Sequence, residues 1–183
     1  MVQNTFIIGI LGSLLLVIGA AWPDKPVPHP ARSTKNWLFA IGGLGMFFYA
    51  FLGYLSGGSV FYVFLQVFVM IASLFMMLNV PDAIDTPLIA IAGIGFVIWS
   101  LMLFEGFGTI FFILGLCGIG IGYALDTGTL KREACLTAGS ILIALFSYLE
   151  GNWIFFWLNL FFALFSGWYV WKFLQRSHQS KPL

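Results

Sequence analysis

The sequence predicts an all-α membrane protein with seven transmembrane helices, and three observations support this prediction. Hydrophobic residues make up 61% of the 183 positions and charged residues only 8%, so the mean hydropathy is +1.00. The apolar residues form unbroken runs, whereas the strands of a transmembrane β-barrel alternate in polarity. All of the basic residues fall on one set of alternate connections between these runs, as expected for a chain that crosses a membrane repeatedly.

The same composition excludes several classes of protein. An ordinary soluble domain carries about 25% charged residues, and 8% cannot cover the surface of such a domain. A water-soluble enzyme and a disordered chain are therefore not expected. The net charge of +1 provides no basic surface for nucleic acid, so no nucleic-acid partner is expected either. The lipid bilayer remains as the main partner.

Seven apolar runs are long enough for a spanning helix, which needs about 20 residues with a range of about 17 to 25. The first run has no preceding basic segment and no clean cleavage site, so it is interpreted as a retained helix and not as a signal peptide. Turn-forming residues separate the runs, among them SGGS, NVPDAIDTP and Glu150-Gly151-Asn152. The predicted spans are 5–22, 36–55, 59–80, 86–104, 107–125, 133–149 and 153–174.

The charge distribution orients these spans. Cytoplasmic connections attract Lys and Arg, so the side that holds the basic residues is predicted to be cytoplasmic. The N-terminus is then outside and the C-terminus inside, with only Glu105 and Glu150 as charges on the outer side. With seven spans, all eight basic residues fall on the inner side: Lys25, Arg32, Lys35, Lys131, Arg132, Lys172, Arg176 and Lys181.

An internal repeat is suggested by three pairs of segments that align in chain order. Residues 58–73 align with 151–166, which places Gln66 against Asn159. The second and sixth spans align as well, and so do the first and fifth. Two three-helix units in the same orientation need one linker helix between them, which fits a transporter built from parallel repeats. The predicted units are 1–80, a linker 86–104, a second repeat 107–174 and a polar cytoplasmic tail 175–183.

Ionisable residues are predicted only at the ends of the spans, and this limits the chemistry. A proton relay or an ion-coupled pump places ionisable groups deep in the membrane, so coupling to ions is not expected. No metal site is expected, because His29 and His178 lie far apart in polar segments. No phosphate-binding loop, nucleophile elbow, cofactor or catalytic residue is identified, and the chain is not expected to be an enzyme.

The neutral polar residues inside the spans are the candidates for a site. A carboxamide in hydrocarbon must find hydrogen-bond partners, and residues i−4, i and i+7 share one face of a helix. Both repeats thus place an aromatic ring, a carboxamide and a hydroxyl on one stripe, facing a central cavity near mid-membrane. Packing between helices through the same polar groups is the equally weighted alternative. The predicted substrate-binding residues are Gln66, Asn159, Tyr62, Ser73, Phe155, Trp157 and Ser166.

The predicted 3+1+3 architecture resembles the SWEET transporters and their bacterial vitamin-transporting relatives, the PnuC family. Three strings are similar to PnuC sequences: KNWLFAIGG (35–43), FLQVF (64–68) and GWYVWKF (167–173). The resemblance implies energy-independent uptake of a nicotinamide riboside-like, thiamine-like or riboflavin-like solute that is later trapped by phosphorylation. The seven prolines are expected to lie outside the spans, so the proline hinges of SWEET transporters are not expected here.

Together these observations predict a facilitator for a small neutral or aromatic solute of the nucleoside, vitamin or sugar class. Its expected location is the bacterial inner (plasma) membrane. A structural or assembly subunit of a larger membrane complex is the alternative from another class, and a small-amide channel is a second one. A homo-oligomer or a larger complex is compatible with either reading.

Overall fold

The structure is a computed structural model that describes residues 2–23, 27–126 and 128–179. This part of the chain forms seven α-helices and one short 3₁₀-helix, and it contains no strand. The elements are α1 (Val2–Ala21), η1 (Pro30–Arg32), α2 (Thr34–Leu55), α3 (Phe61–Leu78), α4 (Asp82–Met102), α5 (Phe107–Ala124), α6 (Leu130–Leu149) and α7 (Trp153–Gln179).

Each of the seven α-helices is long and apolar enough to cross a membrane. This confirms the all-helical class with seven spans and indicates an integral membrane protein. Large apolar side chains cover the outside of the bundle, including Ile91 and Leu164 at 66% and 61% exposed. Such a surface is suited to lipid and would be unusual facing water.

Two helices differ from the predicted ranges by four or more residues at one end. Helix α4 begins at Asp82, four residues before the expected start. Pro87 lies inside this helix, as it already does in the predicted span 86–104, so the expectation that no span contains a proline is wrong. Pro87 is the sixth residue of α4, so it lacks the N–H that would bond the carbonyl oxygen of Ala83. Membrane helices tolerate such a proline because neighbouring groups and small local adjustments can satisfy the freed carbonyl. Helix α7 continues to Gln179, so most of the segment expected as a polar tail is helical. Residues 180–183 of that tail lie outside the described residues.

Short polar side chains set several helix starts. Ser33 Oγ accepts a hydrogen bond from the Asn36 backbone N–H at 3.4 Å before α2. Thr129 Oγ1 accepts one from Arg132 N–H at 3.3 Å before α6. Such caps satisfy backbone donors that have no partner within the helix. Helix α3 ends at Asn79, which adopts a left-handed conformation with φ of 53°.

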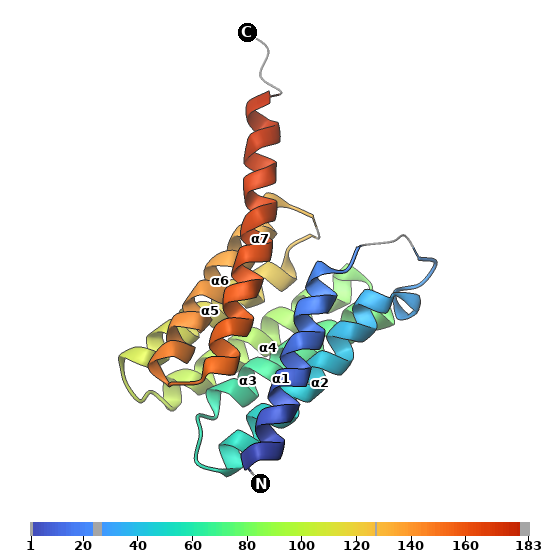
Figure 1. The fold of residues 1–183 in the computed structure, drawn as a ribbon. Helices are drawn as coiled ribbons and strands as arrows, with labels where there is room; N and C mark the ends of the chain where they lie inside the picture. The colour runs from blue at the N-terminus through green and yellow to red at the C-terminus, as the bar shows by residue number, and fades with distance from the viewer. Residues whose placement is uncertain (1, 24–26, 127, 180–183) are drawn as a thin grey trace.

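The helices alternate in direction, so the connections gather at two ends of the bundle (Figure 1). One end carries Arg32, Lys35, Lys131, Arg132 and the last turns of α7 with Lys172, and is called the basic end. The other carries the start of α1 and the turns at Glu105 and Glu150, and is called the acidic end. Lys25 and Lys181 lie outside the described residues.

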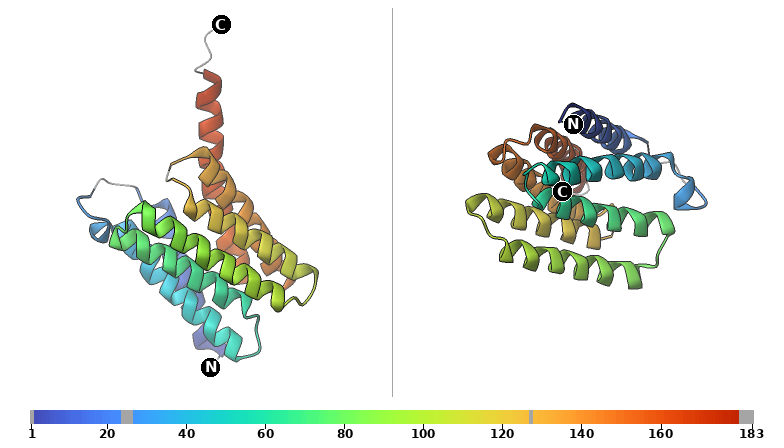
Figure 2. Two further views of the ribbon diagram at one scale, coloured as in Figure 1. Left: turned by 180° about the vertical axis from the view of Figure 1, so that it is seen from behind. Right: turned by 90° about the horizontal axis from the view of Figure 1, so that it is seen from below.

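Glycines bring two pairs of helices into close contact. A Cβ atom on Gly42 of α2 would lie 2.9 Å from the carbonyl oxygen of Gly12 in α1. A Cβ atom on Gly139 of α6 would lie 2.8 Å from the carbonyl oxygen of Gly115 in α5. Helix α7 packs against α6 and also contacts α1, and this second contact joins the two halves of the chain. Helix α4 packs against α3 and α5 (Figure 2). Close backbone approach of this kind is the usual way in which membrane helices associate.

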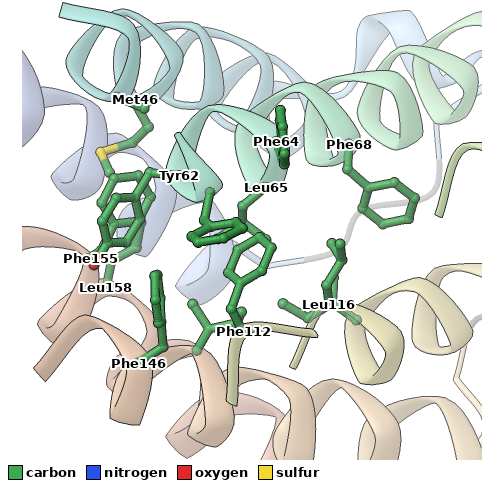
Figure 3. Close-up of a cluster of buried hydrophobic side chains, with 14 of the residues drawn as sticks. Met46, Tyr62, Phe64, Leu65, Phe68, Phe112, Leu116, Phe146, Phe155 and Leu158 are labelled. Carbon is green, nitrogen blue, oxygen red and sulfur yellow. The ribbon is translucent and has the colours of Figure 1, made fainter. Parts of the chain in front are cut away.

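The core lies between α3, α5, α6 and α7 and is rich in aromatic rings (Figure 3). Phe61 and Phe68 of α3, Phe112 of α5, Phe146 of α6 and Phe155 of α7 are all at most 1% exposed. Apart from Phe68, each of these residues lies within six residues of the acidic end of its helix, and Phe68 lies two turns beyond Phe61 in α3. The half of the bundle near the basic end contains a cavity.

Candidate functional site

A cavity of about 550 Å³ enters the bundle from the basic end. Six helices contribute to its lining, with α4 the exception. Its mouth lies among Lys35, Gly128, Arg132, Glu133 and Lys172, all at the basic ends of their helices. A volume of this size lies within the range of about 300–1,000 Å³ that is typical of small-molecule sites.

The two candidate carboxamides both line the deep part of this cavity. Gln66 of α3 is 3% exposed and Asn159 of α7 is 5% exposed. Gln66 is the sixth residue of an 18-residue helix and Asn159 the seventh of 27. Counted from the acidic end at about 1.5 Å per residue, both lie about 7–9 Å along their helices. The carboxamides therefore lie closer to the acidic end than the mid-membrane position that the sequence predicted.

The hydrogen-bonding capacity of these carboxamides is only partly used. Asn159 Nδ2 donates to the carbonyl oxygen of Phe155, one turn earlier in α7, at 2.9 Å. Gln66 Oε1 is fully buried and has no hydrogen-bond partner among the described residues. A buried amide oxygen without a donor costs about 1–3 kcal/mol, so a solute that offers a donor there would recover this free energy.

The two candidate serines also line the cavity, nearer to its mouth, but they differ in their bonding. Ser166 Oγ donates to Phe162 O at 2.8 Å and lies 3.0 Å from Thr137 Oγ1 of α6. This serine therefore joins α7 to α6, as the packing alternative proposed. Ser73 is half-buried on α3, and its hydroxyl makes no hydrogen bond within the described part of the chain.

An aromatic layer closes the deep end of the cavity towards the acidic end. It consists of Phe61, Tyr62, Phe112, Phe146 and Phe155 (Figure 3). The rings of Tyr62 and Phe155 are stacked, with centroids 4.3 Å apart and an interplanar angle of 19°. Tyr62 also contacts Phe146 at 5.3 Å, and Phe61 contacts Phe112 at 4.9 Å. Phe155 is 0% exposed, so its ring is fully covered by its neighbours in this layer.

Tyr62 and Phe155 thus occupy a different place from the one predicted. They lie one turn before Gln66 and Asn159, as their spacing requires, but they do not line the cavity walls. They close its deep end instead. The Tyr62 hydroxyl is buried beside Ser147 without a well-formed hydrogen bond.

The predicted cavity wall at Trp157 is wrong. Trp157 is 52% exposed on the outside of the bundle, where its ring contacts Phe156 and Phe161 of the same helix. The reason is helical periodicity. Asn159 faces inwards, and Trp157 lies two residues away, which turns it by about 200° around α7. The aromatic rings that do line the cavity include Phe39 of α2 and Phe162 of α7, with centroids 6.3 Å apart.

Sequence reasoning missed several lining residues. Ser140 of α6 is 5% exposed and reaches the cavity, as does Tyr123 of α5. The sequence offered one indication, because Ser140 directly follows Gly139 and small residues gather where membrane helices meet. The charged residues of the mouth were identified only as markers of membrane orientation. Nothing in the sequence showed that Lys35, Arg132, Glu133 and Lys172 line one cavity.

A polar contact joins the two halves of the chain at the acidic end. The Tyr49 hydroxyl of α2 donates to Asn152 Oδ1 at 3.0 Å, and the same oxygen accepts the Phe155 backbone N–H at 3.3 Å. Nearby, partial burial raises the pKa of Glu150, and the negative charge of Glu105 raises it further. Within the described residues, no group of three His, Cys, Asp or Glu side chains is placed to hold a metal ion.

Comparison with known proteins assigns no family to this fold and cavity. No protein-family model, curated protein or solved structure matches the chain. The resemblance to SWEET and PnuC transporters therefore stays a prediction from the sequence.

Proposed function

We propose that this integral membrane protein is a facilitator that moves a small aromatic or hydroxylated solute through the cavity between its helices. The observation that supports this proposal most strongly is that Gln66 and Asn159, which are aligned in the proposed repeat, are both buried and line the deep end of one cavity. A closed aromatic layer on one side and an open mouth on the other describe one state of an alternating-access carrier. A permanently open channel for amides is less well supported, because the aromatic layer interrupts the path.

The contacts between aligned glycines support the repeat on which the proposal depends. The alignment pairs Gly12 with Gly115 and Gly45 with Gly139. A Cβ atom on Gly45 would lie 3.1 Å from Gly12 Cα, and one on Gly139 would lie 2.8 Å from Gly115 O. The first and second helices of each proposed unit therefore touch at aligned positions. Two units related in this way, with α4 as the linker, resemble the 3+1+3 plan of SWEET and PnuC transporters.

The charges support the orientation and the energetics of the proposal. We place the basic end in the cytoplasm of a bacterial inner membrane, since cytoplasmic connections attract Lys and Arg. The charged side chains that line the cavity stand at its mouth, and the groups around Gln66 and Asn159 are neutral. Ion-coupled carriers keep ionisable groups at the depth of the site. Transport is therefore proposed to run down the solute gradient without a coupling ion.

Uptake into proteoliposomes tests the proposal. Labelled nucleosides, vitamins and sugars are offered to the wild-type chain and to the variants Gln66→Leu and Asn159→Leu. We expect uptake of at least one solute by the wild type, unaffected by an imposed pH gradient. Each variant should lose it partly, because one lost hydrogen bond weakens binding by about 0.5–1.5 kcal/mol. Trp157→Leu is the control, since this side chain lies outside the cavity and its loss should leave uptake unchanged.

The same variants separate transport from the role of a structural subunit. If both carboxamide variants retain full uptake but melt at a lower temperature, the carboxamides serve to pack helices. Accumulation of free solute above its external concentration on addition of a proton or sodium gradient would contradict the uncoupled mechanism.

A further inference from the structure

The cavity mouth has a charge character that the proposed neutral site does not use. Lys35 of α2, Arg132 of α6 and Lys172 of α7 line it together with a single carboxylate, Glu133. The three cations come from three helices, and Lys172 Nζ lies 5.3 Å from the centre of the Trp168 ring. Lys35 and Arg132 are half-buried rather than extended into solvent. Arg132 Nη1 donates to the carbonyl oxygen of Leu125 at 3.3 Å, and Glu133 interacts electrostatically with both Arg132 and Lys35. Three positive groups and one carboxylate still leave the mouth with a net positive charge.

Membrane orientation alone does not account for this arrangement. The tendency of cytoplasmic ends to carry Lys and Arg applies equally to Lys131, which is exposed and does not line the cavity. Lys35, Arg132 and Lys172, by contrast, line a cavity whose walls are largely apolar. A cleft of one charge sign with low-dielectric walls focuses its field and concentrates counter-ions. The mouth is thus built to attract anions and to repel cations.

The interior below the mouth changes character with depth. Phe39 and Phe162 provide aromatic surface below the charged ring. At the bottom, Gln66 Oε1 is buried without a donor. The lining therefore runs from cationic through aromatic to an unpaired hydrogen-bond acceptor.

We propose that the cavity takes an anionic aromatic solute, with its carboxylate or phosphate held at the mouth and a hydrogen-bond donor on its other end directed to Gln66 Oε1. This inference rests on the proposed function, and it narrows the proposed aromatic or hydroxylated solute to an aromatic solute with a single acidic end. An anionic lipid headgroup has the same chemistry at the mouth, so the test must distinguish a soluble anion from a lipid.

Charged thiol reagents test the sign of the field without knowledge of the solute. In a background with Cys117→Ala and Cys135→Ala, Val69→Cys places one thiol on the cavity wall, one turn from Gln66. The anionic sulfonatoethyl and the cationic trimethylammonioethyl methanethiosulfonates are then applied from the basic end. We expect the ratio of the anionic to the cationic reaction rate to be higher at Val69→Cys than for a free thiol in solution. Lys35→Met, Arg132→Met or Lys172→Met should each reduce that preference several-fold, and high salt should reduce it as well.

Lys131→Met is the matched control, because it removes the neighbouring positive charge outside the cavity. It should leave the preference almost unchanged. A rate ratio equal to that of a free thiol, or one that falls equally with Lys131→Met and with the mouth variants, would overturn the inference. If one mouth variant fails to fold, the anion preference of the other two variants and its dependence on salt still test the inference.

Protection of the same thiol tests the solute class. The matched pairs are uridine monophosphate with uridine, and para-hydroxybenzoate with para-hydroxybenzamide. Protection by the anionic member of a pair at about tenfold lower concentration supports the inference, as expected for a hydrogen bond to a charged group. Equal protection by both members of a pair overturns the inference. If no probe protects the thiol, the ratio of the two methanethiosulfonate reaction rates decides.

Vesicle composition separates the two sources of the anion, and uptake separates this inference from the proposed function. The assays are run in phosphatidylcholine vesicles with and without phosphatidylglycerol. Loss of the anion preference only when phosphatidylglycerol is present would assign the mouth to a lipid headgroup and overturn the solute assignment. An intact anion preference with no uptake of any solute would reject transport while leaving the anionic cavity in place. Uptake confined to neutral solutes would support transport and overturn the assignment of an anionic solute.

Discussion

Phe155→Ala should open the cavity towards the acidic end and make the protein leaky. Phe155 is 0% exposed and stacks on Tyr62 at 4.3 Å, directly beyond Asn159. Removing its ring leaves a hole in the aromatic layer that separates the carboxamides from the acidic end. Truncation of a buried Phe also costs about 3–5 kcal/mol of stability in packed cores. We expect faster entry of ribitol into proteoliposomes, measured by light scattering after osmotic shock, together with a lower melting temperature.

Phe161→Ala is the matched control for this prediction. Phe161 lies on the same helix but is 42% exposed on the outer surface, so its removal opens no path. Its vesicles should be as tight as those with the wild-type chain. If Phe155→Ala lowers the melting temperature but admits ribitol no faster than Phe161→Ala, the layer is ordinary packing and does not gate the cavity.

Gly139→Ala should separate α5 from α6 and destabilise the bundle. A Cβ atom at this position would lie 2.7 Å from the backbone nitrogen of Ile119 and 2.8 Å from Gly115 O. Backbone atoms cannot move aside as a flexible side chain can, so one helix must shift as a whole. Overpacking of this kind typically costs about 1–3 kcal/mol. Thermal unfolding in detergent should show a clear fall in the melting temperature, and the cavity wall formed by neighbouring Ser140 should be displaced.

Gly95→Ala provides the opposite expectation in the same chain. No atom lies within 4 Å of a Cβ built on Gly95 in α4. Alanine is favoured over glycine inside a helix by about 0.5–1 kcal/mol, so this variant should be neutral or slightly more stable. Equal melting temperatures for Gly139→Ala and Gly95→Ala would contradict the close α5–α6 contact.

The sequence was sufficient for the helices because their main determinant is local. Unbroken apolar runs of about 20 residues have few other folded states, and the turn residues between them set the ends within a few positions. The two differences arose where local composition misleads. Helix α4 includes Asp82 and Asp85 before Pro87, and α7 extends into a polar segment, because polar residues can also form part of a helix.

The site was predictable in part. The buried carboxamides Gln66 and Asn159 were identified from the cost of amides in hydrocarbon, a property of the residue type itself. Trp157 was misplaced because an aromatic residue in an apolar run is compatible with both lipid and a cavity, and only helical phase distinguishes them. The mouth was not foreseen because Lys35, Arg132 and Lys172 are far apart in the sequence, and only the packing of α2, α6 and α7 brings them around one opening.

Two-sided accessibility of one cavity residue tests the central claim most directly. Val69→Cys, in the background without native cysteines, is treated with a membrane-impermeant maleimide from either side of sealed vesicles. Lys131→Cys marks the basic side and Ser56→Cys the acidic side, since both positions are exposed. An alternating-access carrier predicts labelling at Val69→Cys from both sides, faster from the basic side. Labelling from the basic side alone, or from neither side, would contradict a solute path through this cavity.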